Sequence, residues 1–304
     1  MKRPPSNVAH SVRTRLLTIA KAEGEEFNYV LIRYALERFL ERLSRSSHRD
    51  AFILKGAMLF RLWSPRTHRP TKDLDLLGRG SPDPARLAAL FVEMCGVEVE
   101  DDGMVFDAKS VKAGRIKEDA EYEGVRVTFV GMLGTARLAL QVDVGFGDAV
   151  SPAPIEIEFP TLLAMSAPKL RAYRRETVVA EKLHAMVDLG IANSRMKDFF
   201  DIWFLSQNFD FDGAVLAHSI GATFDKRKTA LPEAVPFALT EGFSKDDAKQ
   251  KQWKAFMSRL SKTASPKPLD ELVPVIAGFL WPPLDALGAE PAFARTWTAG
   301  GPWR

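Results

Sequence analysis

Two aspartates, Asp73 and Asp75, stand two positions apart in the segment 69–77. On a β-strand, side chains at i and i+2 point to the same side of the sheet about 6.6 Å apart, so the two carboxylates project together while the leucines beside them face the core. A second strand, expected at 137–145, alternates in the same way and carries Asp143 on its polar side. The spacing therefore predicts that three carboxylates converge on one polar edge of a sheet.

A cluster of this kind needs a cation. Two carboxylates about 4 Å apart repel each other by roughly 4 kcal/mol at an effective dielectric constant near 20. Magnesium binds oxygen ligands in octahedral geometry and usually takes only one or two protein carboxylates together with substrate phosphates. We therefore predict that Asp73, Asp75 and Asp143 are Mg²⁺ ligands, with Mn²⁺ as a possible substitute.

An Asp-x-Asp pair taken alone usually marks a solvated strand edge, and that interpretation stays open for Asp73 and Asp75. The sequence that precedes the pair favours the interpretation that the two aspartates are metal ligands. Lys55 and Gly56 follow the apolar run 51–54, and a glycine there permits a tight turn that could present backbone N–H groups to phosphates.

Together, the segments 54–57, 69–75 and 141–145 resemble the DNA polymerase β-like nucleotidyltransferase superfamily. The resemblance implies that a glycine-containing turn holds the triphosphate and that three carboxylates hold two magnesium ions. Ala57 stands where the superfamily commonly has serine, so a hydroxyl contact to phosphate is missing. The nucleotide-binding residues implied in this half of the chain are Lys55, Gly56, Ala57, Arg69 and Thr71.

Two later segments, 181–186 and 195–203, look like the helical motifs of the AbiEii abortive-infection toxin family. The resemblance implies a nucleotidyltransferase of a bacterial toxin–antitoxin system with an antitoxin as partner, and some relatives add nucleotides to the 3′ end of tRNA. It also implies that Lys182 contacts the triphosphate, and that the helix carrying Arg195, Asp198 and Asp201 shapes the nucleotide site. The structural alternatives are a surface lysine, an i,i+3 ion pair between Arg195 and Asp198, and an Asp201 that braces the helix.

The reaction expected is an in-line displacement that transfers NMP from an NTP to an acceptor hydroxyl, with pyrophosphate leaving. Asp73 and Asp75 would hold both metal ions, Asp143 would complete the site nearer the nucleophile, and Lys182 would neutralise the β- and γ-phosphates. The acceptor stays open between the tRNA 3′ end and a protein or small hydroxylated molecule. A noncatalytic module that binds nucleotide or a partner protein is a further alternative.

Composition and motifs argue against several other classes of protein. The 304 residues carry a net charge of only +3, so nucleic-acid contacts must come from local basic regions such as 169–175 and 225–228, each of which is also typical of a solvated surface. The only cysteine is Cys95, a candidate core residue. No apolar run approaches the roughly 20 residues of a membrane span, and no secretion signal is visible, so a cytoplasmic location is expected. P-loop, Gly-x-Ser-x-Gly and dinucleotide motifs are missing.

Hydrophobic periodicity predicts an α/β (α+β) fold: a small mixed or antiparallel sheet forming a nucleotidyltransferase core flanked by helices, and a mainly helical C-terminal part. We expect a boundary near residue 160, which separates 1–160 from 161–304. The tail 294–304 is expected to be loosely structured. Helices are predicted at 8–23, 26–45, 57–63, 84–96, 176–190, 194–206 and 246–263, and strands or strand-like runs at 51–56, 72–77, 97–106, 124–130 and 137–145.

Overall fold

The computed structural model describes residues 8–64, 69–116, 124–260, 267–288 and 293–304. The chain divides into two compact units, and both are discontinuous in sequence. The sheet unit comprises Met1–Gly147 and Ile155–Ala172, and the helical unit comprises Asp148–Pro154 and Tyr173–Arg304. The expected boundary at residue 160 falls inside the second segment of the sheet unit.

The sheet unit is built on a seven-stranded sheet with the order β3-β4-β5-β2-β1-β7-β6. Strands β2 and β5 pair in parallel, as do β1 and β7, and the other neighbours are antiparallel. The predicted mixed sheet is thereby confirmed. The strands are β1 (Phe52–Lys55), β2 (Asp73–Gly78), β3 (Met104–Arg115), β4 (Gly124–Leu133), β5 (Ala136–Phe146), β6 (Ile155–Glu158) and β7 (Lys169–Ala172).

The strand predicted at 97–106 is wrong in its position, because β3 begins only at Met104. A turn occupies the preceding residues. The Oδ1 atom of Asp101 accepts a hydrogen bond from the backbone N–H of Gly103, which has a φ of +74°. Asp102 is 4% exposed and accepts two hydrogen bonds from Arg42, and this buried ion pair holds the turn in place.

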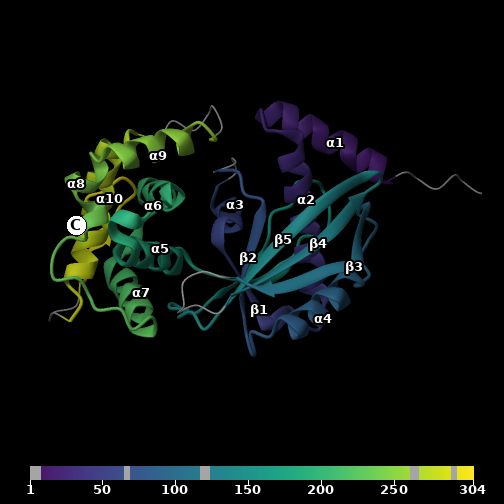
Figure 1. Cartoon of the computed structure of the whole chain (residues 1–304), viewed down its shortest axis with the longest axis horizontal. Coiled ribbons are helices and arrows are strands. Elements are labelled where there is room, and N and C mark those ends of the chain that lie inside the picture. The colour runs from purple at the N-terminus through teal and green to yellow at the C-terminus, as the bar shows by residue number, and fades with distance from the viewer. Residues whose placement is uncertain (1–7, 65–68, 117–123, 261–266, 289–292) are drawn as a thin grey trace, which may run out of the picture. The chain divides into compact units, whose positions relative to one another are not determined.

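Helices cover one face of the sheet. The long helices of this unit are α1 (Val8–Glu23), α2 (Phe27–Arg45) and α4 (Pro84–Cys95), and α4 runs along β3 in Figure 1. A cluster of phenylalanine rings joins α2 and α4 to the sheet: Phe39 lies 5.3 Å from Phe91 and 4.7 Å from Phe129, measured between ring centroids. Short helical turns, η1 (Arg49–Ala51), η2 (Gly56–Leu59) and α3 (Phe60–Trp63), follow or precede β1.

Alternation along the central strands leaves the opposite face polar. Leu74 and Leu76 of β2 are fully buried, as are Val142 and Val144 of β5, with which they are in register. The residues between them point to the other side, away from the phenylalanine cluster. The prediction that Asp73, Asp75 and Asp143 share one face follows this alternation and agrees with the observed burial pattern.

The helical unit consists mainly of α5 (Arg175–Leu189), α6 (Met196–Asn208), α7 (Gly213–Lys226), α8 (Glu241–Ser244), α9 (Asp247–Met257) and α10 (Leu269–Asp285). Helix α10 packs on α6 and α7, and α5 packs on α7 (Figure 1). The turns η3 (Gly190–Ala192) and η4 (Phe237–Leu239) connect these elements. The predicted helix 246–263 ends earlier, at Met257, and its last residues lie outside the described part of the chain.

The tail 294–304 is ordered by packing, so the expectation of a loose segment is wrong. Strand β9 (Thr296–Trp297) pairs with β8 (Phe211–Asp212), and the rings of Trp297 and Trp303 lie 4.9 Å and 5.9 Å from that of Phe279. Both indole N–H groups donate to buried backbone carbonyls. Across the described ranges, every helix is too short or too polar to traverse a lipid bilayer.

Candidate active site

A row of charged side chains crosses the polar face of the sheet. Register places Lys55 of β1 opposite Asp75 of β2, Asp75 beside Asp143 of β5, and Asp143 opposite Arg126 of β4. Neighbouring strands lie about 4.8 Å apart, so the row reads cation, carboxylate, carboxylate, cation over four adjacent strands. The two carboxylates are therefore flanked on both sides by positive charge.

The neighbouring row on the same face begins with Asp73, which is in register with Gln141 of β5. The Nε2 atom of Gln141 lies 3.3 Å from each carboxylate oxygen of Asp143. The hydroxyl of Thr71 donates to the backbone carbonyl of Asp73 at 3.2 Å, just before β2 begins. Thr71 therefore shapes the entry to the strand that carries both aspartates.

Arg126 was not among the residues predicted from the sequence. Its Nε and Nη2 atoms each donate to a different oxygen of Asp143 at 2.8 Å, which is a bidentate pair. The side chain of Arg126 is 45% exposed and that of Asp143 is 21% exposed. The alternation of 124–130 was enough to put Arg126 on the polar face, but only the pairing of β4 with β5 shows which residue it faces.

The carboxylates suit a hard divalent cation in donor type. Asp73, Asp75 and Asp143 offer only oxygen atoms, share one face and occupy two adjacent strands. In the described residues, however, no group of three His, Cys, Asp or Glu side chains is gathered closely enough to hold a metal ion. Both Asp143 oxygens are bonded to Arg126, so metal binding by Asp143 requires the guanidinium to move away.

Gly56 lies directly against Asp75. Its φ is +73°, and a Cβ atom added there would stand 1.9 Å from the Oδ2 atom of Asp75. A side chain at position 56 would therefore displace the carboxylate as well as strain the backbone. The tight turn predicted at Gly56 is present. The group that lies against this glycine in the structure is the Asp75 carboxylate, and a contact with phosphate stays a prediction. Lys55 and Ala57 flank it, both half-buried, and Arg69 is likewise half-buried.

A second charged group lies inside the helical unit. The Nζ atom of Lys182, on α5, lies 2.5 Å from Asp198 Oδ1 and 2.8 Å from Asp201 Oδ2, both on α6. Arg195, at the start of α6, places its Nε atom 2.7 Å from the other oxygen of Asp198. Both aspartates are fully buried, whereas the Arg195 side chain is 45% exposed, so two buried carboxylates are balanced by one nearly buried cation and one that reaches solvent.

Burial alone would raise the pKa of Asp198, but the adjacent Lys182 ammonium and Arg195 guanidinium hold that pKa below its ordinary value. The i,i+3 pair between Arg195 and Asp198 is present as the structural alternative predicted. Lys182 is not an ordinary surface lysine, because only 12% of its side chain is exposed. The structure thus gathers Lys182, Arg195, Asp198 and Asp201 into one network, whose contact with a nucleotide stays a prediction.

The sheet unit thus carries the carboxylate row on its polar face, and the helical unit carries the Lys–Asp–Asp network. The family follows from sequence comparison, in which the model "Nucleotidyl transferase AbiEii toxin, Type IV TA system" matches residues 38–277. The chain belongs to this family of nucleotidyltransferase toxins. No curated protein matches it.

Two solved structures from Helicobacter pylori are similar in fold. One, designated a nucleotidyltransferase, shares 15% sequence identity with a TM-score of 0.49 and covers 85% of this chain and 96% of its own. The other, JHP933, shares 15% identity with a TM-score of 0.47 and covers 85% of this chain and 92% of its own.

Proposed function

We propose that this chain transfers NMP from an NTP to the 3′ end of tRNA, acting with Mg²⁺ as the toxin of a toxin–antitoxin pair in the bacterial cytoplasm. The observation that carries the proposal is the charge row Lys55–Asp75–Asp143–Arg126 with Asp73 beside it on the same face. Membership of the AbiEii family supports the toxin role. The tRNA acceptor rests on the sequence resemblance described above.

Asp73 and Asp75 would hold two Mg²⁺ or Mn²⁺ ions, and Asp143 would join them at the ion nearer the acceptor. Bound ions of this kind neutralise charge on the attacked phosphate and on the leaving pyrophosphate. Gly56 keeps the space that the Asp75 carboxylate occupies, so the position of this ligand is set by the backbone.

Asp143 is the residue best placed to accept the proton of the acceptor hydroxyl, because it lies beside Asp75 at the same register position. Arg126 holds both Asp143 oxygens in this structure and must release at least one of them for that role. The released guanidinium would stay on the same face, where negative charge collects on the transferred phosphate.

Lys182 would neutralise the β- and γ-phosphates. Asp198 and Asp201 accept from two of the three N–H groups of an ammonium, which fixes where the charge of Lys182 lies. Arg195 adds a second cation through its contact with Asp198, so two cations stand against two carboxylates and the network presents no net negative charge to a triphosphate. The aspartates are then positioning residues, and Lys182 is the residue that contacts substrate.

The test is transfer of label from each α-labelled NTP to total bacterial RNA in the presence of Mg²⁺, comparing wild type with Asp75→Asn. We expect label in the tRNA band and a loss of about 100-fold or more in the variant. Glu158→Gln is the matched control, since it removes an exposed carboxylate from β6 of the same sheet and should transfer normally. Undiminished transfer by Asp75→Asn would overturn the assignment.

The position of the label separates the alternatives. Label in protein or in a small molecule would replace the tRNA acceptor while keeping the enzyme. An absence of transfer with every NTP, combined with nucleotide binding, would indicate a noncatalytic module. A steep loss of acceptor affinity with salt is expected for tRNA, because phosphate contacts release counterions.

The toxin role is tested by growth. Expression without an antitoxin should arrest growth, and expression of Asp73→Ala at the same level should not. Equal growth of both strains would remove the toxin role and leave the transferase proposal standing.

A further inference from the structure

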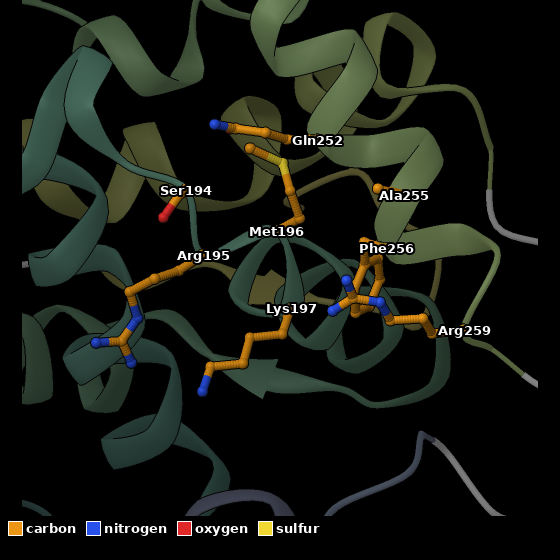
Figure 2. Close-up of a pocket in the computed structure, with 8 residues that line it drawn as sticks. All are labelled: Ser194, Arg195, Met196, Lys197, Gln252, Ala255, Phe256 and Arg259. Atoms are coloured by element: carbon orange, nitrogen blue, oxygen red, sulfur yellow. The ribbon is translucent and has the colours of Figure 1, made fainter.

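The helical unit contains a cavity that has one residue, Arg195, in common with the Lys182 network. Its volume is about 390 Å³, and it lies between the start of α6 and the C-terminal half of α9, as Figure 2 shows. This volume is within the range of small-ligand sites. The lining residues are Ser194, Arg195, Met196, Lys197, Gln252, Ala255, Phe256 and Arg259.

The lining is cationic. Arg195, Lys197 and Arg259 contribute positive charge, and the lining residues that the structure describes include no aspartate or glutamate. Arg195 is paired with the buried Asp198, so Lys197 and Arg259 supply the excess of positive charge in the cavity lining. Lys251, which is exposed, lies one helical turn before Ala255 and extends the positive charge along α9 beyond the cavity.

An aromatic ring stands among these cations. Phe256 is partly exposed and packs against Phe200 and Trp253, with centroid distances of 5.6 Å and 5.5 Å. These contacts hold the ring in place. A fixed ring beside two cations matches the two parts of a nucleotide, because a base stacks on an aromatic side chain while a phosphate pairs with cations.

A buried lysine ties the two walls of the cavity together. Lys249 of α9 is 4% exposed, and its Nζ atom donates to the carbonyl of Asn193 at 2.9 Å. Asn193 in turn accepts a hydrogen bond from the backbone N–H of Arg195 at 2.8 Å. The loop before α6 and the helix α9 are thus held at a fixed separation, so the cavity does not need to be formed by the ligand.

We propose that this cavity binds one nucleotide of a single-stranded nucleic acid, with the base against Phe256 and the phosphate between Lys197 and Arg259. This rests on the proposed function, in which the acceptor is a nucleic acid, and it adds a subsite for that acceptor. A polymer fits better than a free nucleotide because the positive charge continues past the cavity at Lys251.

The experiment measures binding of a fluorescent single-stranded RNA with a 3′-deoxy end, which cannot react, to the full chain without NTP at several KCl concentrations. Lys197→Gln/Arg259→Gln should weaken binding and reduce the slope of log K against log[salt] by about 1.4, for two phosphate contacts on a single strand. Phe256→Leu, which keeps an apolar side chain in the core, should weaken binding about tenfold or more without changing the slope.

The matched control is Lys245→Gln/Lys267→Gln, which removes the same charge from exposed positions in the same unit, outside the cavity lining and outside the basic regions 169–175 and 225–228. It should bind like wild type. Equal weakening by both double variants would overturn the subsite, as would unchanged affinity and slope in Lys197→Gln/Arg259→Gln. Failure of the wild-type chain to bind single-stranded RNA would do the same.

A second measurement distinguishes two possible occupants of the cavity, the acceptor RNA and the free NTP. The KM for NTP should be unchanged in Lys197→Gln/Arg259→Gln, and a raised KM for NTP with unchanged RNA binding would assign the cavity to the nucleotide donor instead. Because RNA binding is measured without transfer, a chain that binds RNA through the cavity but transfers no label would lose the proposed activity and keep this subsite.

Discussion

Substitution of Lys182 by methionine would remove the ammonium that contacts both buried carboxylates, Asp198 and Asp201, while Arg195 would still contact Asp198. Each of the two carboxylate contacts of Lys182 corresponds to roughly 4 kcal/mol of attraction at an effective dielectric constant near 20. Part of that attraction is offset, because methionine does not incur the several kcal/mol of desolvation that a buried ammonium does. The expected net loss of unfolding free energy is about 3–5 kcal/mol, typical of a buried ion pair that loses one partner.

Tryptophan fluorescence suits the measurement, since five of the six tryptophans lie in the helical unit and only Trp63 lies in the sheet unit. Urea unfolding should show the loss of about 3–5 kcal/mol, and heating should show a fall of roughly 10–20 °C for a unit of this size. Asp201→Asn on the methionine background removes one uncompensated carboxylate and should restore part of the stability. A double-mutant cycle between the two sites should give a coupling energy above about 2 kcal/mol.

The pH dependence has a definite sign. The pKa of Asp198 is lowered in the folded protein, so its contribution to stability is present above its ordinary pKa and is lost as the pH falls through the lowered value. In Lys182→Met the buried carboxylates take up protons more easily, so the deficit relative to wild type should shrink between pH 7 and pH 5. If the losses of unfolding free energy of Lys182→Met and Asp201→Asn were additive within about 0.5 kcal/mol, the two side chains would not be coupled. A stability deficit of Lys182→Met that does not change with pH would also contradict this account of the network.

Three further substitutions test single contacts. Gly56→Ala should displace the Asp75 carboxylate and lower kcat about 100-fold, while costing about 1–2 kcal/mol for the positive φ, as shown by transfer kinetics and thermal unfolding. Burial and the neighbouring Arg227 lower the pKa of His184 to about 4, so stability should rise with pH between about 4 and 6.5 by up to about 3 kcal/mol, and His184→Gln should flatten that rise in urea titrations. Arg126→Gln should release Asp143, so that the Mg²⁺-dependent rise in Tm saturates at a lower Mg²⁺ concentration.

Two of these have a comparison variant, and the third is compared with wild type. Gly134→Ala introduces a similar strain at a φ of +60° in a hairpin of the same unit and should leave kcat unchanged. Equal pH profiles for His184→Gln and wild type would contradict a neutral buried imidazole. Arg126→Lys keeps the positive charge but not the bidentate pair, so its Mg²⁺ requirement should lie between those of wild type and Arg126→Gln, and a higher Mg²⁺ requirement in Arg126→Gln would show that the guanidinium assists metal binding.

Much of the local structure could be predicted from the sequence, because local structure depends on short-range periodicity. The alternation around Asp73 and Asp75 gave strand β2 and its polar side, and Asp83 followed by Pro84 gave the start of α4, where the Asp83 carboxylate accepts from two backbone N–H groups. The placement of the aspartates on one face followed from the period of two residues in a strand. The family resemblance carried by these segments is confirmed by the match over residues 38–277.

Only tertiary structure decided which residues meet. Strand β2 pairs with β5 rather than with its successor β3, and this parallel pairing sets Asp143 beside Asp75 although 68 positions separate them. The antiparallel register of β4 with β5 then brings Arg126 onto Asp143. The burial of Asp198 and Asp201 around Lys182 and the docking of Trp297 and Trp303 on Phe279 likewise depend on contacts distant in sequence. Such contacts are chosen by the packing free energy of the whole unit, which a single segment does not contain.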